Sequence, residues 1–190
     1  MSTRPVQLRT PLDEEVLALH AGDRVELSGI VYTARDEAHL RMLEKGIPFD
    51  PRGAVIYHCG PVIRDNKVIA AGPTTSARMN DLSGFLIEKG VRGLIGKGGI
   101  GEMVREQLRG KGVYFAFTGG CAALASSHMV LKGVFYEDLG MAEAIWVIEL
   151  DRLPLVVGID AHGNDIFEAA RINARKVFRS YSATTCTGRQ

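Results

Sequence analysis

The chain has 190 residues, 46% of them hydrophobic, which suffices for one well-buried domain and is short for two. Its 23 Lys and Arg residues balance 22 Asp and Glu residues, so no overall field favours nucleic acid or an anionic membrane. No apolar run approaches the roughly 20 residues that span a bilayer, and Arg4, Gln7 and Arg9 interrupt the N-terminal stretch where a signal peptide is apolar. We therefore expect a cytoplasmic protein with one core that binds neither nucleic acid nor membranes.

The first half of the chain predicts two helices and three strands. Thr10 is a suitable N-cap and Pro11 a suitable first helical residue, so a short helix is expected as far as about Leu19. Hydrophobic periodicity and turn residues then predict, in order, a strand at 24–33, a helix at 36–45 ended by Gly46, and strands at 54–58 and 67–71 on either side of a turn at 64–66.

The second half alternates short apolar strands with helical segments. The predicted elements are a helix at 76–89, a strand at 93–95, a helix at 101–109, a strand at 113–118, a small-residue helix after Gly120, strands at 130–136, 146–150 and 155–160, and a helix at 165–178. Strands separated by helices favour parallel pairing with right-handed crossovers. The sequence thus predicts a single α/β domain with mixed sheets over residues 1–181, followed by a flexible polar tail at 182–190.

Cations gather just after predicted strands. Residues 72–79 read Gly-Pro-Thr-Thr-Ser-Ala-Arg-Met, and a Gly-Pro turn leaving a hydrophobic strand exposes backbone N–H groups to an anion. Arg78 offers a planar fork for a carboxylate, and Lys97, 19 positions later, offers a compact positive charge. Arg35 follows another strand in the same way, and α/β sheets bind ligands at the carboxyl ends of their strands. The three cations, with the hydroxyl groups at 74–76, predict a site for a small acid.

Each of these residues also has a simpler interpretation. Thr74, Thr75 or Ser76 is a preferred helix cap, and one hydroxyl suffices for capping. Arg35 in isolation would be a solvated charge, with Asp36 beside it as a helix cap. A hydroxyl that is not needed for capping is available to donate to a substrate oxygen, or to accept a proton if its pKa is lowered.

Residues 96–101, Gly-Lys-Gly-Gly-Ile-Gly, match a dinucleotide-binding pattern between a predicted strand and a predicted helix. The next strand ends at residues 118–121, Thr-Gly-Gly-Cys, without the acidic residue that holds a ribose, and the lysine precedes the glycines, unlike in a Walker loop. We therefore expect these glycines to let the backbone approach a small anion or another chain. Nucleotide binding is the weaker alternative.

Neither the cysteines nor the histidines have metal-ligand spacing, so we expect no metal site made by this chain alone. The cysteines stand at positions 59, 121 and 186, and the histidines at 20, 39, 58, 128 and 162. Cys121 follows two glycines, where it is either a buried small residue or a thiol activated by a helix N-terminus. The histidines are expected to be structural, with His162 in a turn before the last helix and Asn164 or Asp165 as its cap.

Five motifs follow one another along the chain. They are Thr33-Ala-Arg-Asp-Glu-Ala-His39, Gly72-Pro-Thr-Thr-Ser-Ala-Arg-Met79, Gly96-Lys-Gly-Gly99, Gly119-Gly-Cys-Ala122 and Gly158-Ile-Asp-Ala-His-Gly-Asn164. Together they resemble the β subunit, or the equivalent C-terminal domain, of class I iron–sulfur fumarases and L-tartrate dehydratases, over about residues 5–178. The resemblance implies a swivelling β/β/α domain, and the chain departs from the family pattern mildly at Ala77, where glycine is usual.

The resemblance also implies an activity, a hydro-lyase that adds water reversibly to fumarate to give L-malate. It assigns the catalytic threonine to Thr74, which handles the carbon-bound proton, and substrate binding to Arg35, Arg78 and Lys97, which hold the carboxylates and stabilise the enediolate-like transition state. It implies a four-iron four-sulfur cluster that an α subunit binds and this chain does not, with one iron as a Lewis acid. Homo- and hetero-oligomers are expected, and the chain is expected to be inactive without the α subunit.

Three other functions stay open at this point. The same cations suit a β subunit of L-tartrate dehydratase, which acts on a hydroxylated C4 dicarboxylate. A second alternative is a stand-alone binding module for small acids or nucleotides. A third is a structural subunit whose glycine loops serve only for docking.

Overall fold

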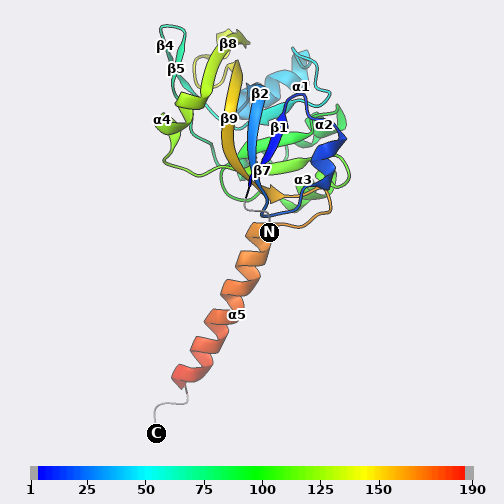
Figure 1. The fold of residues 1–190 in the computed structure, drawn as a ribbon, viewed down its shortest axis with the longest axis vertical. Helices are drawn as coiled ribbons and strands as arrows, with labels where there is room; N and C mark the ends of the chain where they lie inside the picture. Colours follow the sequence, from blue (N-terminus) through cyan, green and yellow to red (C-terminus); the bar gives the residue numbers. More distant parts are fainter. Residues whose placement is uncertain (1–3, 187–190) are drawn as a thin grey trace.

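A seven-stranded mixed sheet organises the fold, and a separate two-stranded hairpin flanks it (Figure 1). The computed structural model describes the backbone of residues 4–186 and the side chains as far as residue 178. The strands are β1 (Val6–Arg9), β2 (Arg24–Thr33), β3 (Val55–Tyr57), β4 (Val62–Arg64), β5 (Lys67–Ala70), β6 (Gly93–Gly96), β7 (Val113–Ala116), β8 (Met129–Phe135) and β9 (Ile145–Ile159). The helices are α1 (Asp36–Lys45), α2 (Gly84–Glu88), α3 (Glu102–Leu108), α4 (Ala122–Ala125) and α5 (Ile166–Cys186), with 3-10 turns η1 (Glu14–Ala18), η2 (Ser76–Met79), η3 (Ser126–His128) and η4 (Glu137–Leu139).

The large sheet is partly closed on itself. Its strand order is β1-β2-β3-β6-β7-β9-β8, and a further pairing between β2 and β9 joins the two sides. Strands β2, β3, β6 and β7 pair in parallel, which confirms the pairing predicted from the strand and helix alternation, whereas β9 runs antiparallel to β2, β7 and β8. Because these four parallel strands share one direction, their carboxyl ends meet at one edge of the sheet.

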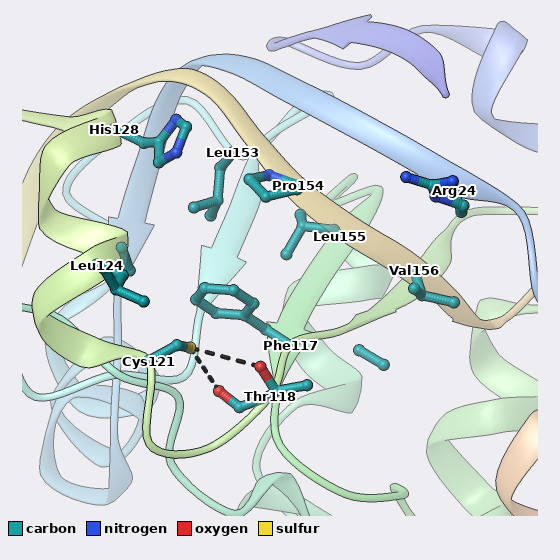
Figure 2. A pocket seen from close by; sticks show the side chains of 12 residues that line it. Arg24, Phe117, Thr118, Cys121, Leu124, His128, Leu153, Pro154, Leu155 and Val156 are labelled. Carbon is teal, nitrogen blue, oxygen red and sulfur yellow. Dashed lines mark hydrogen bonds between the residues drawn. The ribbon is translucent and has the colours of Figure 1, made fainter. Parts of the chain in front are cut away.

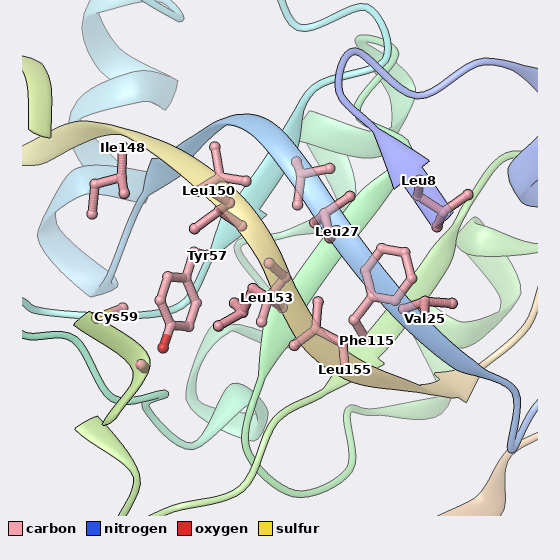
Figure 3. Close-up of a cluster of buried hydrophobic side chains, with 14 of the residues drawn as sticks. Leu8, Val25, Leu27, Tyr57, Cys59, Phe115, Ile148, Leu150, Leu153 and Leu155 are labelled. Carbon is pink, nitrogen blue, oxygen red and sulfur yellow. The ribbon is translucent and has the colours of Figure 1, made fainter. Parts of the chain in front are cut away.

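Side chains on the parallel strands alternate between two hydrophobic cores, as the two-residue period of a strand requires. One core lies between β9 and the parallel strands, and Figure 3 shows Leu27, Phe115 and Leu155 in it. The second core lies between the outer face of the sheet and helices α1, α2 and α3, where Ile56 and Leu94 pack with helix residues such as Met42. The predicted mixed α/β domain is therefore confirmed, with helices α1, α2 and α3 on one face of a partly closed sheet.

Two predicted helices differ from the structure. The first is only the 3-10 turn η1, and its N-cap is Asp13, whose carboxylate accepts from the Glu15 N–H at 2.8 Å, rather than Thr10. The helix predicted at 76–89 divides into η2 and α2. At the break, the buried Ser83 hydroxyl donates to the Met79 carbonyl oxygen at 2.9 Å, a side-chain bond that competes with regular helix formation.

The pairing and the extent of some strands also differ from the prediction. The turn at 64–66 joins β5 to β4, with positive φ at Asp65 and Asn66 as a tight hairpin requires, and β3 instead lies between β2 and β6. The strands predicted at 146–150 and 155–160 form one strand, β9, because Arg152 takes a φ of 48° and bends the strand without ending it.

Helix α5 projects away from the sheet domain (Figure 1). The sequence predicts an end near Phe178, but the helix continues to Cys186, so it includes residues 182–186 of the predicted tail. Residues 187–190 of that tail lie outside the described residues. None of the helices within residues 4–186 combines the length and apolarity needed to cross a membrane.

Candidate functional site

The segment that carries Thr74 lies against the carboxyl ends of β3 and β6. The Thr74 N–H donates to the His58 carbonyl oxygen at 2.6 Å, and the Lys97 N–H donates to the Thr74 carbonyl oxygen at 3.1 Å. The Ser76 N–H then donates to the Lys97 carbonyl oxygen, also at 3.1 Å. Backbone hydrogen bonds therefore place Thr74 and Lys97 side by side at the edge where the parallel strands end.

An ion pair joins Arg78 to the start of α1. An Arg78 guanidinium nitrogen lies 2.5 Å from an Asp36 carboxylate oxygen, and the arginine side chain is half exposed. Asp36 is the first residue of α1 and not its N-cap, so the capping interpretation of Asp36 is wrong. The pair brings the Arg35-Asp36 junction and the Arg78 turn to the same edge as Lys97.

Glu143 holds Arg35 and the first turn of α1 together. One of its carboxylate oxygens lies 3.3 Å from Arg35 Nε, and the other accepts from the Glu37 N–H at 3.1 Å. Both side chains of the pair are mostly buried, with 23% of Arg35 and 19% of Glu143 exposed. The guanidinium packs on Gly60, where a Cβ atom would lie 2.8 Å from Arg35 Nη1. Arg35 is therefore a fixed charge and not a freely solvated one.

Thr74 and Lys97 keep their functional groups available. Thr74 is half buried, and no hydrogen bond within the described residues engages its hydroxyl. Lys97 is exposed, and its ammonium group has no ion-pair partner among the residues that the structure describes. Its aliphatic stem passes Gly119, where a Cβ atom would lie 3.0 Å from Lys97 Cδ, so the glycine leaves room for the lysine. A hydroxyl and an ammonium group at the sheet edge are thus free to contact a ligand.

Helix capping does not explain the three hydroxyl groups. Thr75 is the N-cap of η2, but its side chain makes no capping bond. Ser76 is buried below the edge, and its Oγ lies 2.8 Å from His58 Nδ1 and 3.0 Å from the Tyr114 hydroxyl oxygen. Thr75 therefore occupies the capping position without a capping bond, and the capping interpretation is wrong for Ser76, which lies inside η2. Gly96 makes room for this serine, because a Cβ atom there would lie 1.7 Å from Ser76 Oγ.

Two buried histidines lie beneath the site. His39 Nδ1 lies 2.7 Å from the Arg35 carbonyl oxygen, and the His39 and His58 rings have centroids 5.6 Å apart. Burial lowers the pKa of His39, and burial followed by the neighbouring His39 lowers the pKa of His58 well below its ordinary value. Both rings are therefore neutral at physiological pH.

Sequence reasoning missed the supporting residues His58, Tyr114 and Glu143. A histidine directly after the apolar run Val-Ile-Tyr is a signal for His58, because a polar ring at the end of a buried strand needs a partner. No comparable signal marks Glu143, which lies 108 positions from Arg35 in a turn after η4.

An apolar pocket of about 340 Å³ lies beside the 118–121 loop (Figure 2). Phe117, Leu124 and Leu155 line it, together with the half-buried Cys121, whose thiol donates to the Thr118 carbonyl oxygen. None of the four predicted site residues lines this pocket. Its lining suits an apolar group and not a dicarboxylate, so we place the candidate site at the sheet edge.

The remaining polar motifs have structural roles, and the described residues include no set of metal ligands. The Asp160 carboxylate accepts hydrogen bonds from the backbone N–H groups of Ala21, His162 and Asn164, and Asp165 accepts from the first turn of α5, as predicted for its cap. Residues 4–178 contain no group of three or more His, Cys, Asp or Glu side chains able to hold a metal ion. Burial raises the pKa of Cys59 to about 12, so this thiol is a poor metal ligand.

Comparison with known proteins identifies the family of the chain. Residues 1–170 match the family model described as "Fumarase C-terminus". The chain belongs to the class I fumarase and tartrate dehydratase β-subunit family. This family assignment confirms the resemblance carried by the five sequence motifs.

Curated relatives within the family carry two different names. "Putative L(+)-tartrate dehydratase subunit beta" of Methanocaldococcus jannaschii is 41% identical over 169 residues, covering 82% of this chain and 87% of the relative. "L(+)-tartrate dehydratase subunit beta" of Escherichia coli K12 is 38% identical over 170 residues, with 84% and 85% covered. "Putative fumarate hydratase class I" of Geobacillus stearothermophilus is 37% identical over 174 residues, which are 87% of this chain but only 34% of that longer protein. Membership of the family identifies the chain as a hydro-lyase subunit but does not decide whether the substrate is fumarate or tartrate.

Proposed function

We propose that this chain is the β subunit of a two-subunit class I fumarate hydratase, which hydrates fumarate reversibly to L-malate. The observation that carries the proposal is the backbone ladder that sets Thr74 beside Lys97, at the edge where Arg35 and Arg78 also lie. A C4 dicarboxylate has two carboxylates to bind, and its reaction moves one proton at carbon. The site offers three cations, of which Arg35 is paired with Glu143 and Arg78 with Asp36. The Thr74 hydroxyl has no hydrogen-bond partner among the described residues.

Each residue has a separate role in this proposal. Arg35 and Arg78 bind substrate carboxylates with their planar guanidinium groups, and Lys97 adds a point charge. The same cations stabilise the negative charge that develops when the carbon-bound proton leaves. Thr74 would act as its alkoxide, stabilised by the neighbouring cations; it would accept that proton from the substrate carbon and become the neutral hydroxyl, which returns the proton in the reverse reaction.

The iron–sulfur cluster implied by the family resemblance would belong to an α subunit, since residues 4–178 offer no ligand set of their own. When bound there it would supply a Lewis acid toward substrate oxygens. The active site would then form between the subunits, and a swivelling movement of the β domain would open and close it. This arrangement implies that the chain alone is inactive and forms a hetero-oligomer with the α subunit; we further propose that the β subunit also associates with its own copies.

The second candidate substrate is L-tartrate, which the names of two of the relatives favour. The same three cations would hold its two carboxylates. The acids differ at the carbons between the carboxylates, so groups from the α subunit are able to decide between them.

The first test is an anaerobic pull-down of the full chain from its native extract, followed by assays of fumarate hydration and tartrate dehydration. Hydration of fumarate by a complex with an iron–sulfur partner supports the proposal, and preference for tartrate selects the second candidate. Recovery without a partner, together with a thermal shift of the isolated chain by fumarate, tartrate or NAD, would instead indicate a stand-alone binding module.

Substitutions in the assembled complex test the residue roles. Thr74→Ala should lower kcat by about 10²- to 10⁴-fold, the range for loss of general acid–base catalysis. Thr75→Ala is the matched control, because Thr75 is the adjacent exposed threonine and its side chain makes no capping bond. Lys97→Met should raise KM or lower kcat strongly. Altered assembly with unchanged kinetics would assign these residues to docking.

A further inference from the structure

A closed circuit of hydrogen bonds lies directly beneath the candidate site. We infer that His58, Ser76 and Tyr114 are positioning residues that hold Thr74 and Lys97 in their working geometry. This inference rests on the proposed function for the roles of Thr74 and Lys97. The hydrogen-bond circuit itself stands on the structure alone.

The backbone half of the circuit connects the two reactive residues to two of the supporting residues. His58 accepts the Thr74 N–H at 2.6 Å, Thr74 accepts the Lys97 N–H at 3.1 Å, and Lys97 accepts the Ser76 N–H at 3.1 Å. The His58 N–H in turn donates to the Ile95 carbonyl oxygen of β6 at 2.8 Å. A shift of His58 or Ser76 is therefore transmitted to both Thr74 and Lys97.

The side-chain half closes the circuit. His58 Nδ1 lies 2.8 Å from Ser76 Oγ, which lies 3.0 Å from the Tyr114 hydroxyl oxygen. The Tyr114 hydroxyl also donates to the carbonyl oxygen of Gly98, the residue after Lys97, at 2.8 Å. All three side chains are fully buried, at 0% exposure, so water cannot replace a lost partner. From the protein interior, these three side chains thus hold in place the loop that carries Lys97.

Only one placement of the protons satisfies all three hydrogen bonds, from His58 to Ser76, Ser76 to Tyr114 and Tyr114 to the Gly98 carbonyl. A carbonyl oxygen only accepts, so Tyr114 gives its single proton to Gly98, and Ser76 then donates to the Tyr114 oxygen. His58 must therefore donate from Nδ1–H to Ser76, which leaves Nε2 as a bare acceptor. Nε2 of His58 is in fact buried without a hydrogen-bond partner within the described residues. A neutral His58 protonated at Nδ1 is thus part of the arrangement.

The kinetic test compares two buried serines in the assembled complex. Ser76→Ala should lower kcat about 10- to 100-fold with a smaller change in KM, because misplacement of a reacting group acts mainly on turnover. Ser83→Ala is the matched control, since Ser83 is equally buried but donates only within its own turn, to Met79. Tyr114→Phe is a second variant that should also lower kcat. Unchanged kcat for Ser76→Ala, or an equal loss for Ser83→Ala, would overturn the inference.

Two measurements on the full chain are independent of catalysis. Nitrogen-15 NMR of labelled histidine should show His58 protonated at Nδ1, and this preference should disappear in Ser76→Ala. The same substitution should speed hydrogen exchange at the Thr74 and Lys97 amides relative to Ser83→Ala. A His58 protonated at Nε2, or unchanged exchange, would overturn the inference even if the complex is active. Failure of the Thr74→Ala assay with these signatures present would reject only the catalytic role of Thr74.

Discussion

The two neutral histidines beneath the site make stability fall as the pH is lowered through their ordinary pKa of about 6.5. Burial lowers the pKa of both His39 and His58 in the folded chain, so below pH 6.5 the unfolded chain binds protons that the folded chain does not. Their contribution is therefore present above pH 6.5 and is lost on acidification. A ring that stays neutral over the whole range from pH 7.5 to pH 5.5 contributes a loss on the order of 1 kcal/mol, which is the upper limit for each of the two rings.

Urea unfolding of the full chain at pH 7.5, 6.5 and 5.5, followed by circular dichroism, measures this decline. Asp160 has a lowered pKa in the folded chain because its hydrogen bonds outweigh the opposing effect of burial, so its own contribution is lost only at more acidic pH. His39→Asn should remove part of the decline, since the amide is able to donate as Nδ1–H does but does not titrate. His128→Asn, at a partly exposed ring whose Nδ1 lies 2.7 Å from the Asp151 carbonyl oxygen, should leave most of it in place. A constant free energy of unfolding across the three pH values would refute the reasoning.

Three substitutions test other contacts. Glu143→Gln removes the charge that faces Arg35 at 3.3 Å and should raise KM for the dicarboxylate severalfold, and steady-state assays that find an unchanged KM would contradict this. Gly96→Ala places a Cβ atom 1.7 Å from Ser76 Oγ and should cost about 1–3 kcal/mol in urea unfolding; the double variant with Ser76→Gly should recover part of that loss. Asp160→Ala leaves three backbone N–H groups without their acceptor and should lower the free energy of unfolding by about 3 kcal/mol, whereas a loss below 1 kcal/mol would show that water replaces the carboxylate.

Local patterns in the sequence predict the regular elements well. The alternation in residues 24–33 and the helical spacing in 36–45 match β2 and α1 at both ends, because each pattern reflects one buried face. The division of the helix at 76–89 was not predictable in this way, since it involves a buried hydroxyl bonded within its own turn. The single strand β9 was missed because its bend at Arg152 resembles a turn in sequence, and only pairing with β2 keeps the two halves in one strand.

The candidate site, too, was predictable from the sequence only in part. Parallel strands bring their carboxyl ends together, so the grouping of the Arg35 and Lys97 segments followed from topology that the sequence predicts. Arg78 follows β5, which lies in the separate hairpin, and it reaches the same edge through the bridge between Thr75 and Lys97 and the ion pair with Asp36. The partners of these residues come from distant segments, such as Glu143 for Arg35, and no local pattern signals them. Ser76 looked like a helix cap because serine is common in that position, yet tertiary packing assigns it to His58.

The pairing of β2 with β9 also bears on how the chain folds. Residues Arg24 to Tyr32 pair with partners from Val156 back to Val147, so the closing contacts of the sheet join segments more than 100 positions apart. Contacts of such long sequence separation form late, because a large loop must be closed before they stabilise anything. During synthesis, β2 and β7 would expose unpaired edges until β9 has left the ribosome. The last strand to be made is thus the one on which closure of the sheet depends.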